Sequence, residues 1–263
     1  MIFEEKYPDH PLREADAIPM INRDIRGRIF GGMLFAAFLW FHLFYVKKGW
    51  GAFTPGAKIN SLLISATIVL FLSSYVLRKK PVRFPEGFRE TLFPLVCAAL
   101  PLVIYHSVEL LRYVPVQNRY YNVIVDFFGL SDNALFRWNV VSMLLVLAGN
   151  GITLLGMFSL RRSFSIMVEA REPVFRGLYA YVRHPLYLGE IVATAGVLVF
   201  RFSPFNAVLF VLFVLCQIVR ADLEEQKLLS VFPEYKDYRR RTGAFFPRVV
   251  RARVSQTSND RES

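Results

Sequence analysis

The residues best suited to chemistry lie in two clusters in the C-terminal third of the chain. The first cluster holds Tyr179, Tyr181, Arg183, His184, Tyr187 and Glu190, and the second holds Arg220, Asp222, Glu224 and Glu225. The stretch "YVRHPLYLGE", residues 181–190, leads directly into about thirty mostly apolar residues. Ionisable side chains at membrane depth are costly and usually have a function. We therefore expect a ligand site where a membrane segment begins.

The residue types favour a ligand that carries both charges and an aromatic ring. Pro185 suits the first turn of a helix, so His184 is expected at or beside the N-cap, where backbone N–H groups and the helix dipole attract a carboxylate. Tyr187 can donate a hydrogen bond or stack on a ring. Arg220 and Glu224 are four residues apart and share a helix face. A carboxylate beside aromatic side chains suits an ammonium or a sulfonium. S-adenosylmethionine has all of these groups.

The same residues have a structural alternative. Arg183 and Arg220 can be positive-inside anchors, and the tyrosines can form an aromatic belt at the membrane interface. Arg220 and Glu224 can also form an ordinary surface pair, which stabilises a helix by only a few tenths of a kcal/mol. Composition and spacing alone leave both interpretations open.

Membrane helices must position these clusters. Of the 263 residues, 54% are hydrophobic and 25 are Phe, and apolar runs of about 18 residues with few charges are typical of membrane helices. Six such runs occur, at 29–46, 59–77, 91–111, 137–160, 186–202 and 204–221. The sequence predicts an all-α, multi-pass membrane helix bundle of about six spans. The last two runs, each near the lower length limit of a span, form a helical hairpin whose open ends carry the two clusters.

The distribution of the net charge of +11 predicts the orientation. Lys and Arg flank the apolar runs and form no basic helix, which argues against a nucleic-acid partner. Segments 78–90 and 161–183 hold five each, whereas 47–58 and 112–137 hold three each. Since positive residues concentrate on the cytoplasmic side, both termini are expected in the cytoplasm, at a bacterial inner membrane or the endoplasmic reticulum.

Four regions follow from this pattern. They are a cytoplasmic tail (1–28), membrane helices 1–4 (29–160), a cofactor-binding region with the helical hairpin (161–247) and a disordered tail (248–263). The long aromatic segment 112–136 is expected at the outer surface. Cys97 and Cys216 fall inside apolar runs and are interpreted as buried apolar residues, and no Cys/His spacing predicts a metal site.

The two clusters carry a resemblance to a known family. "GLYAYVRHPLYLGE" and, after about thirty residues, "RADLEEQKLLSVFPEYKDYRRRTGAFFP" resemble the isoprenylcysteine carboxyl methyltransferases, which belong to a wider set that includes phospholipid N-methyltransferases. The shared pattern is G-x-Y, then R-H-P-x-Y-x-G, then R-x-x-x-E-E-x-x-L with F-x-x-x-Y-x-x-Y and a closing proline. The spacing from Phe232 to Tyr235 is one residue shorter than in the family. The resemblance covers 161–247, about a third of the chain.

The resemblance implies a site for S-adenosylmethionine at the cytoplasmic end of the last helices. Its cofactor-binding residues would be Tyr179, His184, Pro185, Leu186, Tyr187, Gly189, Glu224 and Glu225, together with the segment Arg171, Glu172, Pro173 and Val174. Arg220 would face the substrate as the catalytic residue. The methyl acceptor would be lipid-like, would enter from the bilayer and, by the family's name, would be an isoprenylcysteine carboxylate. No obligatory protein partner is implied.

Other functions fit parts of the pattern. One is phospholipid N-methylation, and another is the NADPH-dependent reduction of sterols or steroids. The membrane reductases resemble this chain in R-H-P-x-Y-x-G-E, which includes Glu190, and in "R-x-T-x-x-x-x-P" from Arg240 to Pro247. Arg239–Arg241 could hold the 2′-phosphate of NADPH. A third possibility is a membrane scaffold without activity. Cofactor binding separates the three.

Overall fold

The computed structural model describes residues 14–53, 55–105, 132–160, 163–200 and 202–248. Its helices are α1 (Glu14–Gly49), α2 (Pro55–Leu77), α3 (Gly87–Tyr105), α6 (Asp132–Leu160), α7 (Pro185–Phe200), α8 (Pro204–Val231) and α9 (Tyr235–Arg241), with short 3-10 turns η1 (Trp50–Ala52) and η3 (Gly177–Ala180). Within these ranges, extended pairing is limited to isolated bridges, Arg83 with Ala170 and Val182 with Gly243. The predicted all-α bundle is confirmed.

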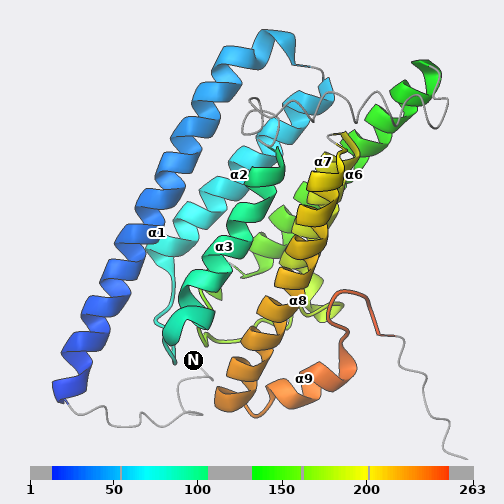
Figure 1. The fold of residues 1–263 in the computed structure, drawn as a ribbon. Coiled ribbons are helices and arrows are strands. Elements are labelled where there is room, and N and C mark those ends of the chain that lie inside the picture. Colours follow the sequence, from blue (N-terminus) through cyan, green and yellow to red (C-terminus); the bar gives the residue numbers. More distant parts are fainter. Residues whose placement is uncertain (1–13, 54, 106–131, 161–162, 201, 249–263) are drawn as a thin grey trace, which may run out of the picture.

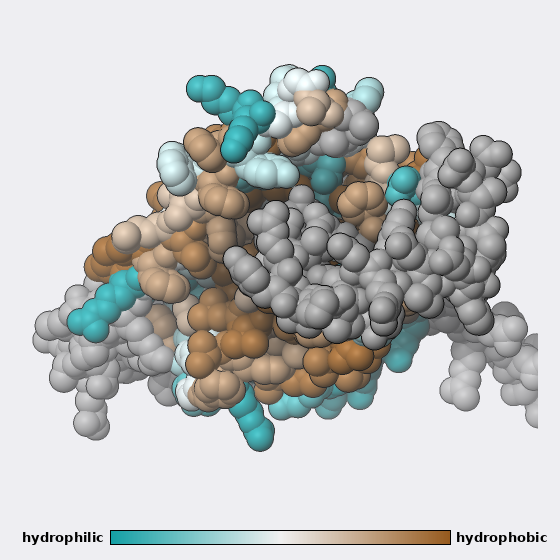
Figure 2. All heavy atoms as spheres, turned by 45° about the horizontal axis from the view of Figure 1, so that its top comes forward, coloured by the Kyte–Doolittle hydropathy of each residue, from teal (hydrophilic) through white to brown (hydrophobic). Residues whose placement is uncertain are grey.

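Five helices are long and apolar enough to cross a membrane: α1, α2, α3, α6 and α8. The sixth apolar helix, α7, has 16 residues and is shorter than the roughly 20 that a spanning helix usually needs. Many large hydrophobic side chains point outward, such as Trp40 and Phe30, which are 69% and 59% exposed. Hydrophobic residues cover much of the visible face of the described helices (Figure 2). This surface suits lipid, and the chain is an integral membrane protein.

Helix α1 starts well before the first apolar run. It begins at Glu14, so residues 14–28 of the predicted cytoplasmic tail are helical. Asp24, in this polar part, pairs with Arg28 at 2.7 Å and with Arg78, after the end of α2, at 3.0 Å. Most of the predicted interfacial segment 112–136 lies outside the described residues, and so does the predicted disordered tail 248–263 apart from Arg248.

Glycines bring α6 and α7 into close contact. A Cβ added at Gly149 of α6 would lie 2.2 Å from the backbone nitrogen of Ala193 in α7. A Cβ at Gly189 of α7 would lie 2.5 Å from Thr153 Oγ1 in α6. Small residues at such positions let membrane helices approach backbone to backbone. The packing sets the position of α7, which carries the first chemical cluster at its start.

A substitution at this contact tests the packing. Gly149→Ala is expected to lower the free energy of unfolding by about 1–3 kcal/mol, because the new methyl group would push α6 and α7 apart. Gly151→Ala is the matched control, since a Cβ there meets no atom within 4 Å in the described structure. Thermal unfolding in mild detergent compares the two variants. Equal midpoints would contradict the close contact.

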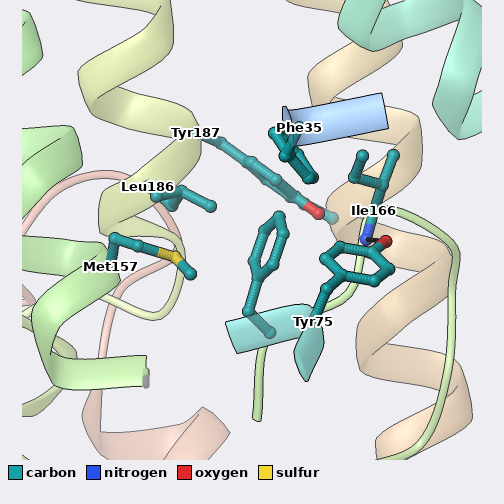
Figure 3. Close-up of a cluster of buried hydrophobic side chains, with 8 residues drawn as sticks. Phe35, Tyr75, Met157, Ile166, Leu186 and Tyr187 are labelled. Carbon is teal, nitrogen blue, oxygen red and sulfur yellow. Dashed lines mark hydrogen bonds between the residues drawn. The ribbon is translucent and has the colours of Figure 1, made fainter. Parts of the chain in front are cut away.

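A buried cluster joins the N-terminal helices to the chemical residues. Its members are Phe35 of α1, Tyr75 of α2, Met157 of α6, Phe164 and Ile166 of the α6–η3 connection, Leu186 and Tyr187 of α7, and Ala221 of α8. The Tyr75 hydroxyl accepts a hydrogen bond from the Ile166 backbone N–H at 3.2 Å. In Figure 3 the Tyr187 side chain extends from α7 across this cluster toward Ile166. The apolar core therefore holds Tyr187 in place.

Candidate functional site

A cavity is lined in part by the C-terminal end of α8 and by α9. Figure 1 shows that these two helices meet at one end of the bundle. The volume of the cavity is about 100 Å³, and its lining shares Leu160, Ser163, Glu172, Pro173 and Val174 with a neighbouring cavity of about 750 Å³. Small-molecule sites usually measure about 300–1,000 Å³, so the narrow cavity and the wider one together have room for a cofactor.

The narrow cavity gathers most of the residues named from the sequence. Its lining includes Tyr179, His184, Leu186, Tyr187, Glu224, Arg171, Glu172, Pro173 and Val174. Four others do not line it: Pro185, Gly189, Arg220 and Glu225. Pro185 starts α7, and Gly189 packs against α6. Contact of any of these residues with a cofactor stays a prediction.

Tyr187, Glu224 and Arg220 form a connected group between α7 and α8. The Tyr187 hydroxyl donates a hydrogen bond to Glu224 Oε1. The Arg220 guanidinium lies 4.6 Å from the centre of the Tyr187 ring, and its Nη2 donates to the Ile166 carbonyl at 2.8 Å. Arg220 Nε is 3.9 Å from Glu224 Oε1. The Glu224 carboxylate is thereby held at the cavity wall, with Arg220 behind the tyrosine ring.

Glu225, the next residue of α8, binds three cationic or imidazole side chains. Arg183 Nε and His184 Nε2 lie 2.7 and 2.9 Å from its Oε1, and Arg239 Nε lies 2.7 Å from its Oε2. The imidazole of His184 is parallel to the Tyr187 ring, with centroids 5.5 Å apart and an interplanar angle of 4°. Glu225 thus orients the histidine that lines the cavity.

The segment after α9 closes over the start of α7. The backbone N–H groups of Arg183 and His184 donate to the carbonyls of Gly243 and Ala244 at 2.9 and 3.0 Å. His184 is the N-cap of α7, since its carbonyl accepts the N–H of Leu188 at 3.0 Å. The sequence predicts free backbone N–H groups at this helix start for a ligand. The N–H of His184 is not one of them, because it is already bonded to Ala244.

Tyrosines from η3 and α9 supply neutral donors. Tyr238 donates its hydroxyl proton to the Tyr179 carbonyl at 2.6 Å. Burial is the largest influence on both phenols, and it raises the pKa of Tyr179 well above its ordinary value and raises the pKa of Tyr238 as well. Both hydroxyls therefore stay protonated at neutral pH.

Sequence reasoning missed part of the cavity wall, the segment 163–169. Its residues alternate in burial: Phe164, Ile166, Val168 and Ala170 are buried, whereas the alternate positions Ser165, Met167 and Glu169 are partly buried. Ser165, Met167 and Glu169 line the cavity, and Ser165 Oγ is buried with no hydrogen-bond partner in the described structure. The signal was the period-two alternation of "FSIMVEA", which is typical of extended chain rather than of a loop.

Comparison with known proteins supports the resemblance. The family model of the isoprenylcysteine carboxyl methyltransferase family matches residues 141–230. This region is similar to the isoprenylcysteine carboxyl methyltransferase family. It contains most of α6, all of α7 and nearly all of α8, and therefore His184, Tyr187 and Glu224, whereas α1, α2, α3 and α9 lie outside it.

Three relatives are each similar to part of the chain. The nickel-cobalt-cadmium resistance protein NccN of Alcaligenes xylosoxydans xylosoxydans is 37% identical over 34% of this chain and 42% of its own length. The cobalt-zinc-cadmium resistance protein CzcN of Cupriavidus metallidurans is 38% identical over 32% of this chain and 39% of its own length. The protein-S-isoprenylcysteine O-methyltransferase of Saccharomyces cerevisiae is 29% identical over 47% of this chain and 58% of its own length. The chain thus spans about two fifths to three fifths of these relatives. In the described ranges, no group of three or more His, Cys, Asp or Glu side chains suits a metal ion.

Residues outside the region that the family model matches hold one wall of the cavity in place. The backbone of 168–170 pairs with the connection from α2 to α3 and with the start of α3: Val168 N–H donates to the Glu90 carbonyl, and Ala170 N–H to the Arg83 carbonyl, both at 3.0 Å. Arg171 Nε donates to Glu169 at 2.9 Å, and Arg78 Nη1 lies 3.9 Å from the same carboxylate. The N-terminal half therefore holds the wall segment in its extended form.

Proposed function

We propose that this protein is an S-adenosylmethionine-dependent membrane methyltransferase that acts on a lipid-like or membrane-associated acceptor. The observation that carries the proposal is the Tyr187–Glu224 hydrogen bond at the wall of a cavity, inside the region that the methyltransferase family model matches. The yeast relative, named as an isoprenylcysteine O-methyltransferase, supports it. By resemblance to the family, the favoured reaction is O-methylation of an isoprenylcysteine-type carboxylate.

The residues of the cavity fit the groups of this cofactor. Glu224 has 23% of its side chain exposed, and its carboxylate is a partner for an ammonium. The parallel rings of His184 and Tyr187 offer aromatic surface for the base or the sulfonium. Ser165, Met167 and Glu169 complete the lining on the side of the extended segment. When bound, S-adenosylmethionine would supply a methyl group on a sulfonium.

The residues of the chain would act by positioning and by excluding water. Glu225 holds His184, and Arg220 holds Tyr187, so the cavity wall is organised before a ligand arrives. Arg220 would hold the acceptor at the membrane side. Holding two reactants in a fixed geometry can lower the activation free energy by several kcal/mol, and a closed site protects the transfer from water.

A ligand titration tests the proposal. The full chain in mild detergent is heated with S-adenosylmethionine, S-adenosylhomocysteine or NADPH, because a ligand that binds only the folded state stabilises it, by about 2.7 kcal/mol at a hundred times its dissociation constant. Both adenosyl ligands are expected to raise the midpoint. A shift with NADPH alone would make the protein a reductase, and no shift with any of the three would contradict a cofactor site.

Glu224→Gln is expected to weaken the binding of S-adenosylhomocysteine about 10- to 100-fold. The variant removes a hydrogen bond to a charged group, which typically contributes about 1.5–3 kcal/mol, and leaves the Tyr187 hydroxyl with a neutral partner. Asp222→Asn is the matched control, because Asp222 lies on the same helix but is exposed and bonded to Gln226. Titration calorimetry measures both. Equal affinities for the two variants would remove Glu224 from the site.

A further inference from the structure

A polar pair lies farther into the membrane than the Tyr187–Glu224 bond. Gln217 Nε2 of α8 donates to Glu190 Oε2 of α7 at 2.5 Å. Glu190 follows Tyr187 by three residues, and Gln217 precedes Arg220 by three, so each lies about one turn along the same helix face. The resemblance to the methyltransferases assigned no role to this pair.

Two atoms beside this pair lack hydrogen-bond partners in the described structure. Gln217 is fully buried, and its Oε1 is unpaired. Arg220 is 3% exposed, and its Nε makes no hydrogen bond. Buried polar groups without partners are costly, and functional sites are among the places where they occur. A carbonyl oxygen and a guanidinium N–H thus remain available to a polar group that enters between α7 and α8.

The negative charges around the Glu190–Gln217 pair outnumber the positive ones. Among the described residues, Arg220 is the cation that faces Glu190 and Glu224, since Arg183 and Arg239 bind Glu225. Tyr187 of α7 and Cys97 of α3 also face Arg220, and both are uncharged in their ordinary forms. Two carboxylates against one guanidinium leave one negative charge. On the function proposed above, the sulfonium of the cofactor would balance it.

We propose that Glu190, oriented by Gln217, receives the proton of an uncharged acceptor that carries an O–H, S–H or N–H group. The acceptor atom forms a bond to the methyl carbon, the carbon–sulfur bond breaks with its electron pair on sulfur, and the acceptor proton passes to the Glu190 carboxylate. The site is neutral before the transfer and neutral after it. A carboxylate acceptor would instead leave an unbalanced negative charge at membrane depth, which is costly.

This inference rests on the proposed function but differs from it in the acceptor. Carboxyl methylation is the reaction that the family resemblance favours. Glu190 and Gln217 of this chain point to an alcohol, a phenol, a thiol or an amine. Failure of the inference therefore leaves the methyltransferase activity intact, and the two are tested by different measurements.

The first test compares two ligands and needs no acceptor. Wild-type protein is expected to bind S-adenosylmethionine more tightly than S-adenosylhomocysteine, because only the former carries the sulfonium charge. Glu190→Gln is expected to reduce this preference about tenfold. The control is Thr194→Val, which removes a hydroxyl bonded to the Glu190 carbonyl of the same helix and leaves the carboxylate in place. An unchanged preference in Glu190→Gln would overturn the charge balance, whereas absence of binding by either ligand in the wild type would contradict the proposed function.

The second test uses the wild-type chain in its own membranes and is independent of any folding defect in a variant. Membranes are incubated with methyl-labelled S-adenosylmethionine and then treated with alkali. Methyl esters release labelled methanol, whereas methylated oxygen of an alcohol, sulfur or nitrogen keeps the label. The label is expected to resist alkali. Release as methanol would overturn the inference while supporting methyl transfer.

Discussion

Arg220→Ala is expected to lower methyl transfer about 10²- to 10³-fold and to leave S-adenosylhomocysteine binding within a few-fold of wild type. The guanidinium stacks on Tyr187 and bonds to the Ile166 carbonyl, and its Nε makes no hydrogen bond in the described structure. Its removal takes away the donor that would hold the acceptor. Glu224, which is proposed to bind the cofactor, remains in place.

The expected pattern is a loss in kcat/KM without a matching loss of cofactor affinity. Single-turnover transfer in membranes and calorimetric titration measure the two quantities separately. Arg240→Ala is the control, because Arg240 is an exposed cation, with 70% of its side chain accessible, outside the cavity lining. Arg220→Lys keeps the charge but loses the planar stacking and is expected to lie between Arg220→Ala and wild type. An equal loss of cofactor affinity would place Arg220 in direct contact with the cofactor instead.

Glu225→Ala is expected to lower the free energy of unfolding by about 3–5 kcal/mol. The carboxylate is 3% exposed and is shared by Arg183, His184 and Arg239. The Arg183 and His184 side chains are themselves only 10% and 6% exposed. Removal of the anion leaves a buried guanidinium without its partner, at the point where α7, α8 and α9 meet.

Thermal and denaturant unfolding of the purified protein measure this effect. Glu225→Gln keeps an acceptor of similar shape and is expected to lose less stability than Glu225→Ala. Asp222→Ala changes an exposed carboxylate of the same helix and is expected to stay within about 0.5 kcal/mol of wild type. If Glu225→Ala melts like Asp222→Ala, the three contacts to Glu225 do not stabilise the fold.

The membrane helices were predictable because lipid constrains composition directly. A spanning segment must be apolar outside and must bond its own backbone, so each apolar run of the sequence corresponds to a helix: α1, α2, α3, α6, α7 and α8. The beginning of α1 was not predictable in this way. Its polar first part is held by the ion pair between Asp24 and Arg78, and a pairing across 54 positions leaves no local pattern.

The two motifs predicted which residues would lie close together, but not which carboxylate would line the cavity and which would form ion pairs. Local spacing placed His184 at a helix start and put Arg220 and Glu224 on one helix face, and the structure brings His184, Tyr187 and Glu224 to one cavity. Glu224 and Glu225 are adjacent and chemically identical. Because successive helical residues differ in direction by about 100°, Glu224 lines the cavity, whereas Glu225 forms ion pairs with Arg183 and Arg239.

From its amino acids alone, the chain is identifiable as a membrane helix bundle with a family-specific ligand motif near its C-terminus, since hydropathy and short motifs are local properties. The extended wall segment 163–169, the unpaired Gln217 Oε1 and the choice of Glu225 as an ion-pair centre arise from tertiary contacts. Each depends on side chains from helices far apart in sequence, such as Tyr75 beneath Ile166 and Glu190 beside Gln217. Burial and pairing of these groups exist only once the helices have packed.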